Sequence, residues 1–391
     1  MTDKLKRNIR LLSLFNFFND FVFFAPVAII YFARVTGSIT LGMSIFSVAY
    51  ISSAIFEIPT GIISDFVGRK KTMILGTIFS IICIVFYAIG GNYWIMMVGA
   101  ISQGLSRSFF SGNNNAFLHD LLKEAGLEKE YHSYLGKTGS LFQVALASAS
   151  IIGGIIASIS LSLSVYLSVI PQICCLVIVL FMDELSITSK ESGNIFIHIK
   201  DSLYHFKNNY KLRLLTITSS LRFAVLESKY FLESAFVNLL WPIWAVGVYS
   251  MFKHIFGALS FYFSGRVINK YNPLKVLSFE IIYGRIVNLT CLIFPTIISP
   301  ALMSTTSLTF GVGTVATNSL LQKEFTEHQR ATMGSLNSLI GSISFGIFSV
   351  TIGFLADKIG IINALIIANV IVFIPLYYYR KIFLHEKIGS K

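Results

Sequence analysis

Seven ionisable side chains inside long apolar stretches are the residues of this sequence best placed to do chemistry. They are Asp20, Glu57, Arg107, Arg222, Glu227, Lys253 and Arg285. A charged side chain at the centre of a membrane span costs roughly 2.5–3.5 kcal/mol on insertion scales, so it tends to face a cavity or a partner. There a carboxylate can carry a proton or hold a substrate, and an arginine can hold a carboxylate or phosphate through two hydrogen bonds.

Two interpretations of these residues stay open. Asp20 is either a proton- or substrate-binding carboxylate or a structural partner for the amide of Asn16 or Asn19. Arg107 and Arg222 either contact substrate in a cavity or form structural ion pairs.

Other charges in the same stretches have simpler explanations. Glu57 stands two residues before Pro59, near the expected inner end of its segment, which favours a role in stabilising a gate. Lys229 and Glu233 are four residues apart, so they are expected to pair on one helix face. Glu227 is expected to lie nearer the outer side of the membrane.

The charges near mid-depth predict the kind of substrate. Asp20 is the one acid among them, against four cations: Arg107, Arg222, Lys253 and Arg285. If most of these side chains face one cavity, its field is positive. That favours an anionic, zwitterionic or peptide-like compound over a purely lipophilic cation.

Composition shows which elements must position these residues. The chain has 391 residues, of which 54% are hydrophobic and 13% charged, whereas soluble domains carry about 25% charged residues. Continuous apolar runs, rather than the alternation of a barrel, predict membrane-spanning helices. The net charge of +12 is explained by basic loops beside a membrane, not by nucleic-acid binding.

Twelve apolar segments can be counted, which predicts an all-α protein of two six-helix bundles. They lie near 10–33, 40–63, 72–90, 93–118, 135–157, 163–182, 212–234, 241–264, 275–295, 299–321, 332–356 and 361–379. The loops on one side carry most of the lysines and arginines, and those on the other side hold only Arg34 and Lys358. Both termini are therefore predicted to be cytoplasmic.

The predicted domains are an N-terminal bundle (1–182), a cytoplasmic linker (183–211) and a C-terminal bundle (212–391). In the linker, apolar residues from Phe196 to Tyr210 recur every three or four positions, which predicts a helix on the inner membrane surface. Weak echoes at an offset of about 200 residues, such as Gly153-Gly154 and Gly353, favour repeated halves and a transporter that rocks about a central site.

A short cationic turn separates the second and third segments. It reads GIISDFVGRKK and contains Gly61, Asp65, Gly68 and Arg69. This pattern resembles the signature between helices 2 and 3 of the major facilitator superfamily, and the twelve segments resemble that fold over nearly the whole chain.

Further stretches resemble a prokaryotic drug-efflux-like branch of the superfamily. They are FEIPTG at 56–61, FSG at 110–112, AFLHD at 116–120 and RAT at 330–332. The arginine that the family carries in helix 4, three residues before a Gln-Gly pair, is replaced here by Ala100, and Arg107 follows the pair instead.

The resemblance implies that the turn forms part of an inner gate. Asp65 is expected to face the start of the eleventh helix, near residues 332–335. Arg69 is expected to bond Asp120 at the inner end of the fourth segment. The matching turn at Ser264-Gly265-Arg266 lacks the acid, so the gate is expected to be asymmetric.

The function predicted is proton-coupled export of a small organic molecule by alternating access, in the inner (plasma) membrane. Efflux is implied by the branch resemblance alone. Alternatives are an importer or symporter of an anionic or zwitterionic nutrient, and a non-transporting membrane sensor. The expected partners are the substrate, protons and the lipid bilayer, with no nucleic acid, and the expected state is a monomer.

Enzymatic chemistry is not predicted. Gly136-Lys137-Thr138 lacks the earlier glycine of a phosphate loop, and Gly311 and Gly313 lie in an apolar span, where they indicate helix packing. The seven histidines show no ligand spacing and the four cysteines fall in apolar runs, so neither a metal nor a cofactor is expected.

Overall fold

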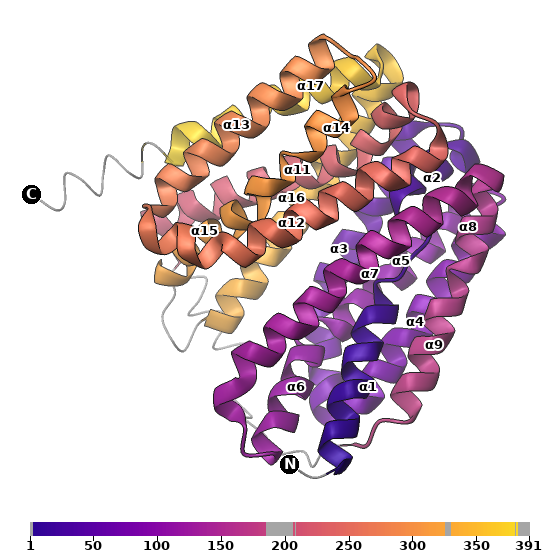
Figure 1. Cartoon of the computed structure of the whole chain (residues 1–391), viewed down its shortest axis with the longest axis vertical. Helices are drawn as coiled ribbons and strands as arrows, with labels where there is room; N and C mark the ends of the chain where they lie inside the picture. The colour runs from indigo at the N-terminus through magenta and orange to yellow at the C-terminus, as the bar shows by residue number, and fades with distance from the viewer. Residues whose placement is uncertain (1–2, 185–205, 208, 325–329, 380, 382–391) are drawn as a thin grey trace, which may run out of the picture. The chain divides into compact units, whose positions relative to one another are not determined.

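Every predicted apolar segment is mainly helical, in one to three pieces, in the computed structural model of the chain (Figure 1). The structure describes residues 3–184, 206–207, 209–324, 330–379 and 381. Within these residues all regular elements are helices, and seven helical stretches are long and apolar enough to cross a membrane. The prediction of an all-α membrane protein is confirmed.

The helices of the first half run from α1 to α9. Their bounds are α1 Asp3–Asn19, η1 Ala25–Val27, α2 Ala28–Thr36, α3 Ile39–Val67, α4 Arg69–Ile89, α5 Tyr93–Phe110, α6 Asn113–Glu124, η2 Glu128–Glu130, α7 Tyr131–Ile159, α8 Leu161–Leu167 and α9 Val169–Leu180. Those of the second half are α11 Tyr210–Leu240, α12 Ile243–Lys270, α13 Pro273–Ile293, α14 Ser299–Ser304, α15 Ser307–Glu324, α16 Arg330–Ile359 and α17 Ile361–Ile371.

The chain forms two compact units, and two helices contribute to both. The first unit contains Met1–Gly37, Val48–Glu191 and Pro242–Met251, and the second contains Ser38–Ser47, Ser192–Trp241 and Phe252–Lys391. The division therefore cuts α3 after Ser47 and α12 after Met251. The predicted surface helix of the linker falls mostly on residues 185–205, outside the described part, so the linker stays a prediction.

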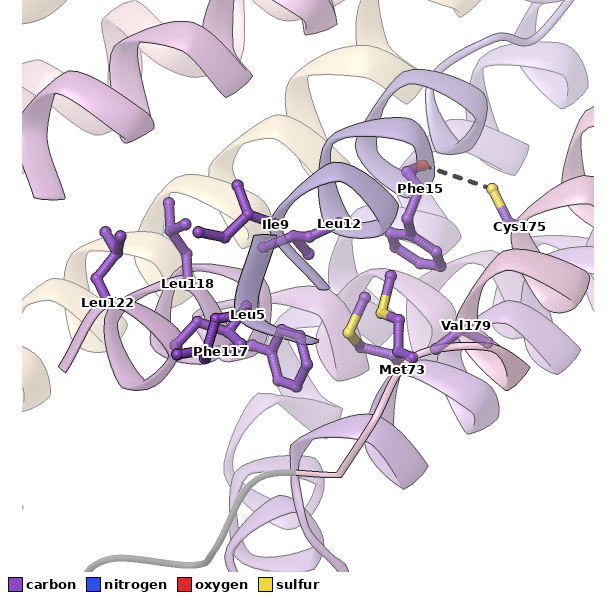
Figure 2. Close-up of a cluster of buried hydrophobic side chains, with 12 residues drawn as sticks. Leu5, Ile9, Leu12, Phe15, Met73, Phe117, Leu118, Leu122, Cys175 and Val179 are labelled. Atoms are coloured by element: carbon purple, nitrogen blue, oxygen red, sulfur yellow. Dashed lines mark hydrogen bonds between the residues drawn. The ribbon is translucent and has the colours of Figure 1, made fainter. Parts of the chain in front are cut away.

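Apolar side chains at helical spacing on α1 build a core of the first unit (Figure 2). Leu5, Ile9, Leu12 and Phe15 form one face of α1 and are buried against α6 and α9. The thiol of Cys175 on α9 donates a hydrogen bond to the carbonyl of Phe15 (3.6 Å). Cys83, Cys175 and Cys291 are buried, and all four cysteines are free, as expected for small core residues.

The first apolar segment is broken, although the sequence suggested one continuous span over 10–33. α1 ends at Asn19, and the backbone is irregular through residues 20–24 before η1 and α2 begin. Irregular backbone at membrane depth is tolerated only where it is buried in protein or lines a cavity, because its polar groups need partners. Two features of the sequence signal this break: Pro26, and the polar pair Asn19-Asp20 at the point where α1 ends.

Side chains of the sixth segment satisfy the freed backbone groups. Ser168 accepts a hydrogen bond from the Phe23 amide (3.0 Å), and Gln172 donates to the Asn19 carbonyl (3.1 Å). Gly153 on α7 lies so close that a Cβ there would overlap the Phe23 carbonyl oxygen. The break is thus held by specific contacts within the first unit.

Within the cationic turn, a single residue separates the two helices. α3 ends at Val67, Gly68 has a positive φ (+94°), and α4 begins at Arg69. Glu184 covers this turn: its carboxylate accepts from the Lys70 amide (3.2 Å). A side chain at position 68 would be strained and would also meet that carboxylate.

Candidate functional site

Asp20 and Arg107 are two candidate residues of the first unit that act on one another. Asp20 stands at the first residue of the irregular stretch after α1 and is partly buried. The charge of the Arg107 guanidinium on α5 acts electrostatically on its carboxylate. The Asn19 amide also contacts Asp20 (3.5 Å). The contact with Asn19 agrees with the structural interpretation of Asp20, and its role in binding a proton or substrate stays a prediction.

The Arg107 side chain is anchored on an aromatic ring. Its guanidinium lies over the ring of Tyr50 on α3 (4.2 Å to the centroid) and donates to the Tyr50 hydroxyl (3.3 Å). This geometry leaves the charge exposed at the surface of its unit, where an arginine stacked on an aromatic ring is held in place while still able to bind an anion.

A polar cluster surrounds the cationic turn. Arg69 contacts Asp120 (Nε to Oδ2, 3.8 Å) and donates to the Ser64 hydroxyl (3.1 Å). Asn113, at the start of α6, accepts from Ser64 (3.0 Å) and donates to the Arg69 carbonyl (3.1 Å). The predicted contact between Arg69 and Asp120 is confirmed, and Ser64 and Asn113 were missed because their types give no charge signal.

For three further members of the predicted sites the functional role stays a prediction. Gly61 has open space around its Cα. Glu57 is half-buried on α3, and its role stays a prediction. The side chain of Asp65 lies outside the described part of the chain, so its contact with residues 332–335 also stays a prediction.

The second unit holds a buried charge network on α11, α12 and α13. Arg222 forms an ion pair with Glu280 (Nη2 to Oε2, 3.1 Å), and its Nε donates to the same oxygen (3.4 Å). The close Nη2 contact is poorly aligned, so Nε makes the hydrogen bond while Nη2 contributes charge. Of the two interpretations left open for Arg222, the ion pair is present in this structure, and a contact with substrate stays a prediction.

Glu233 joins two lysines in the same network. Its two oxygens contact Lys229 (3.0 Å) and Lys253 (2.6 Å), and all three side chains are largely buried. Lys253 also lies over the Tyr230 ring (4.3 Å). The predicted pairing of Lys229 with Glu233 is confirmed, and Lys253 is added to it from α12.

Arg285 differs from these cations. Its residue is 3% exposed, and its Nε and Nη1 have no hydrogen-bond partner among the described residues. Glu227, the remaining candidate, is half-buried on α11. Thus α11 to α13 bring Arg222, Lys253 and Arg285 into one unit. The same helices add Glu233 and Glu280, two carboxylates that were not among the mid-depth charges counted from the sequence.

Glu280 is another residue of the candidate sites that the sequence analysis missed. It stands five residues before Arg285 in the same apolar segment, so an ionisable residue inside a span was the available signal. Gly313 on α15 makes room for the pair, since a Cβ there would lie 2.9 Å from Arg222 and 3.1 Å from Glu280. Gly311 also packs closely, because a Cβ there would lie 2.6 Å from the Phe261 backbone nitrogen, as expected for helix packing.

Comparison with known proteins decides the family. The family model described as Major Facilitator Superfamily matches residues 10–349. The chain belongs to the major facilitator superfamily. The resemblance of the turn and the helix pattern is thereby confirmed, and this superfamily member is a transporter rather than an enzyme.

Relatives of this superfamily member agree with that assignment. An uncharacterised MFS-type transporter of Methanocaldococcus jannaschii is 24% identical over 367 residues, covering 87% of this chain and 88% of its own. The crystal structure of nucleoside transporter NupG has a TM-score of 0.81 at 13% identity, over 98% of this chain and 99% of that one. The structure of a D-xylose-proton symporter has a TM-score of 0.73 at 14% identity, over 96% of each. At such identity the solved structures show the shared fold.

Proposed function

We propose that this protein is a secondary transporter that couples proton movement to the passage of a small organic molecule by alternating access. It lies in the cell's inner membrane with both termini in the cytoplasm, as the distribution of basic residues favours. The observation that carries the proposal is the position of Asp20 at a break in the first membrane segment, where the charge of Arg107 acts on it.

The physical reason is that a carboxylate at such a break can change partners. In low dielectric, the proton affinity of a carboxylate depends strongly on nearby cations and hydrogen bonds. Asp20 interacts with Arg107 on α5 and with the Asn19 amide. Small movements of α1 relative to α5 therefore suffice to bind or release a proton.

Two directions of transport are considered. Export of the molecule in exchange for protons follows from the branch resemblance of residues 56–61, 110–112 and 330–332. Proton symport into the cell is the second candidate, and it is favoured by structural neighbours described as a D-xylose-proton symporter and a fucose:proton symporter.

The test is an accumulation screen in cells that express the full chain and lack their main efflux pumps. Antibiotics, metabolites and siderophore-like compounds are offered, and any compound whose cellular level depends on the protein is followed with and without a protonophore. We expect the protonophore to abolish the difference. Lower accumulation in expressing cells indicates export, and higher accumulation indicates symport.

Asp20→Asn is the diagnostic variant, and Glu128→Gln is its matched control because Glu128 is exposed in the short helix before α7. Asp20→Asn should remove the proton-dependent transport of the compound at unchanged expression, and Glu128→Gln should retain it. Transport by Asp20→Asn with the pH dependence of the wild type would refute the coupling role.

A further inference from the structure

We propose that the second unit contains an oxyanion-binding site centred on Arg285, which takes a carboxylate or phosphate group of the transported molecule. This inference rests on the proposed function, because it assigns a substrate class to that transporter. Arg285 is only 3% exposed, yet two of its nitrogen donors, Nε and Nη1, bond to no described residue.

The nearby carboxylates are already engaged. Glu280 and Glu233 both act electrostatically on Arg285. Glu280, however, is paired with Arg222 (3.1 Å), and Glu233 is shared by Lys229 and Lys253 (3.0 and 2.6 Å). Neither carboxylate is within ion-pair distance of Arg285 in the described part of the network.

Charge balance points to the missing partner. Among the described side chains of this network, four basic residues (Arg222, Lys229, Lys253 and Arg285) face two carboxylates, Glu233 and Glu280. A buried cation without a compensating anion is strongly unfavourable. A bound oxyanion would offset the surplus charge, and the guanidinium fork is suited to hold it through two parallel hydrogen bonds.

Asn288 extends the site by one helical turn. It stands three residues after Arg285 on α13, so both side chains lie on neighbouring positions of one helix face. Its residue is 0% exposed; Nδ2 donates to the Gly284 carbonyl (2.6 Å), while Oδ1 has no partner among the described residues. A ligand that carries an amino or hydroxyl donor beside its oxyanion would satisfy both residues.

Binding must accompany a conformational opening, since Arg285 and Asn288 are closed from solvent in this structure. That requirement fits a site which is loaded in one state of a transport cycle and shielded in another. Ligand binding should therefore shift the stability of the folded protein, because it favours the state that holds the ligand.

The test uses the purified full-length protein in detergent and follows thermal unfolding by tryptophan fluorescence. Sodium phosphate, sodium acetate and alanine are titrated separately against sodium chloride at constant ionic strength. We expect a saturable rise in Tm for wild type with at least one of these probes. A response to phosphate alone assigns a phosphate group, and a stronger response to alanine than to acetate assigns a zwitterion that also uses Asn288.

Arg285→Gln should lower the affinity for whichever probe stabilises the wild type by about tenfold to a hundredfold. This is the usual range for a lost charge-assisted hydrogen bond. Arg285→Lys keeps the charge without the fork and should fall in between, and it replaces Arg285→Gln if that variant does not fold. Lys358→Gln is the control, because Lys358 lies at the exposed end of α16.

Two results would overturn the site: equal titrations of wild type and both Arg285 variants, or no oxyanion response beyond that to chloride. The measurement involves no gradient, so it is independent of proton coupling. Asp20→Asn should keep the oxyanion response. Intact oxyanion binding without proton-dependent transport would therefore refute the proposed function alone.

Discussion

Glu233 is the residue on which two buried lysines depend. It is 2% exposed, and its two oxygens contact Lys229 and Lys253 from two different helices. Removing a carboxylate from two buried basic side chains costs more stability than removing a surface partner, since water cannot replace it there. The residue thus links α11 to α12 through charge as well as through packing.

Replacing Glu233 with Gln should destabilise the protein, because Lys229 and Lys253 are buried and both lose the carboxylate that they contact. Breaking a buried pair costs about 3–5 kcal/mol. Thermal unfolding of the purified variant in detergent measures the loss. The control is Glu324→Gln. Glu324 contacts Lys211 (2.8 Å), whose side chain is 37% exposed, so we expect this variant to lose at most about 1 kcal/mol of stability. Equal Tm values for the two variants would contradict this account.

At the scale of elements, the break between α1 and α2 depends on what packs against it. Ser168 and Gln172 supply its hydrogen bonds, and Gly153 supplies the space for the Phe23 carbonyl. A helix break of this kind is a feature of two segments together, the one that bends and the one that accommodates the bend.

Gly153→Ala should therefore strongly destabilise the protein or prevent its accumulation in the membrane, because its Cβ would overlap a backbone oxygen that has little freedom to move. The matched control is Gly257→Ala in α12, where a Cβ meets nothing within 4 Å. That control should be neutral or gain up to about 1 kcal/mol from helix propensity. Unfolding in detergent distinguishes the two, and a wild-type Tm for Gly153→Ala would disprove the close packing.

At the scale of the whole molecule, the first residues of α3 belong to the second unit. Asp357, near the end of α16, accepts hydrogen bonds from the Ile39 amide (2.9 Å) and the Thr40 amide (2.8 Å), and from the hydroxyls of Ser38 and Thr40 (2.6 Å each). This carboxylate caps the N-terminus of α3, although 317 residues separate it from Thr40.

Asp357→Ala should loosen the start of α3 without unfolding the chain. Loss of a cap costs about 1 kcal/mol, which corresponds to roughly fivefold faster opening at the capped amides. Hydrogen exchange with peptide resolution measures this: a peptide over residues 38–47 should exchange faster, and one over residues 93–110 should not change. Lys358→Gln, one residue further on, is the control, and the same exchange rates in both variants would rule out the cap.

The sequence was sufficient for features that depend on position along one helix. The apolar segments, the turn at Gly68 and the pairing of Lys229 with Glu233 all follow from local spacing. The contact of Arg69 with Asp120 came instead from the family resemblance.

Contacts that depend on how helices are rotated about their axes were not predictable in the same way. The pairing of Arg222 with Glu280 and the cap by Asp357 join residues far apart in the chain. Depth in the membrane can be estimated from sequence, but the direction of a side chain around its helix is set by packing against neighbours. The basic residues near mid-depth could consequently be named from the sequence, whereas the pairing of Arg222 with Glu280 could not.

The close crossing of α7 and α12 in the first unit has a consequence for how this sequence can change over evolution. A Cβ on Gly154 would lie 2.9 Å from the Cα of Gly247, and a Cβ on Gly247 would lie at the same distance from the Cα of Gly154. The obstacle on each side is main chain, which no compensating side-chain substitution can remove. Related sequences that keep this crossing should thus retain glycine at both positions together, and those that lose one should be free to lose the other.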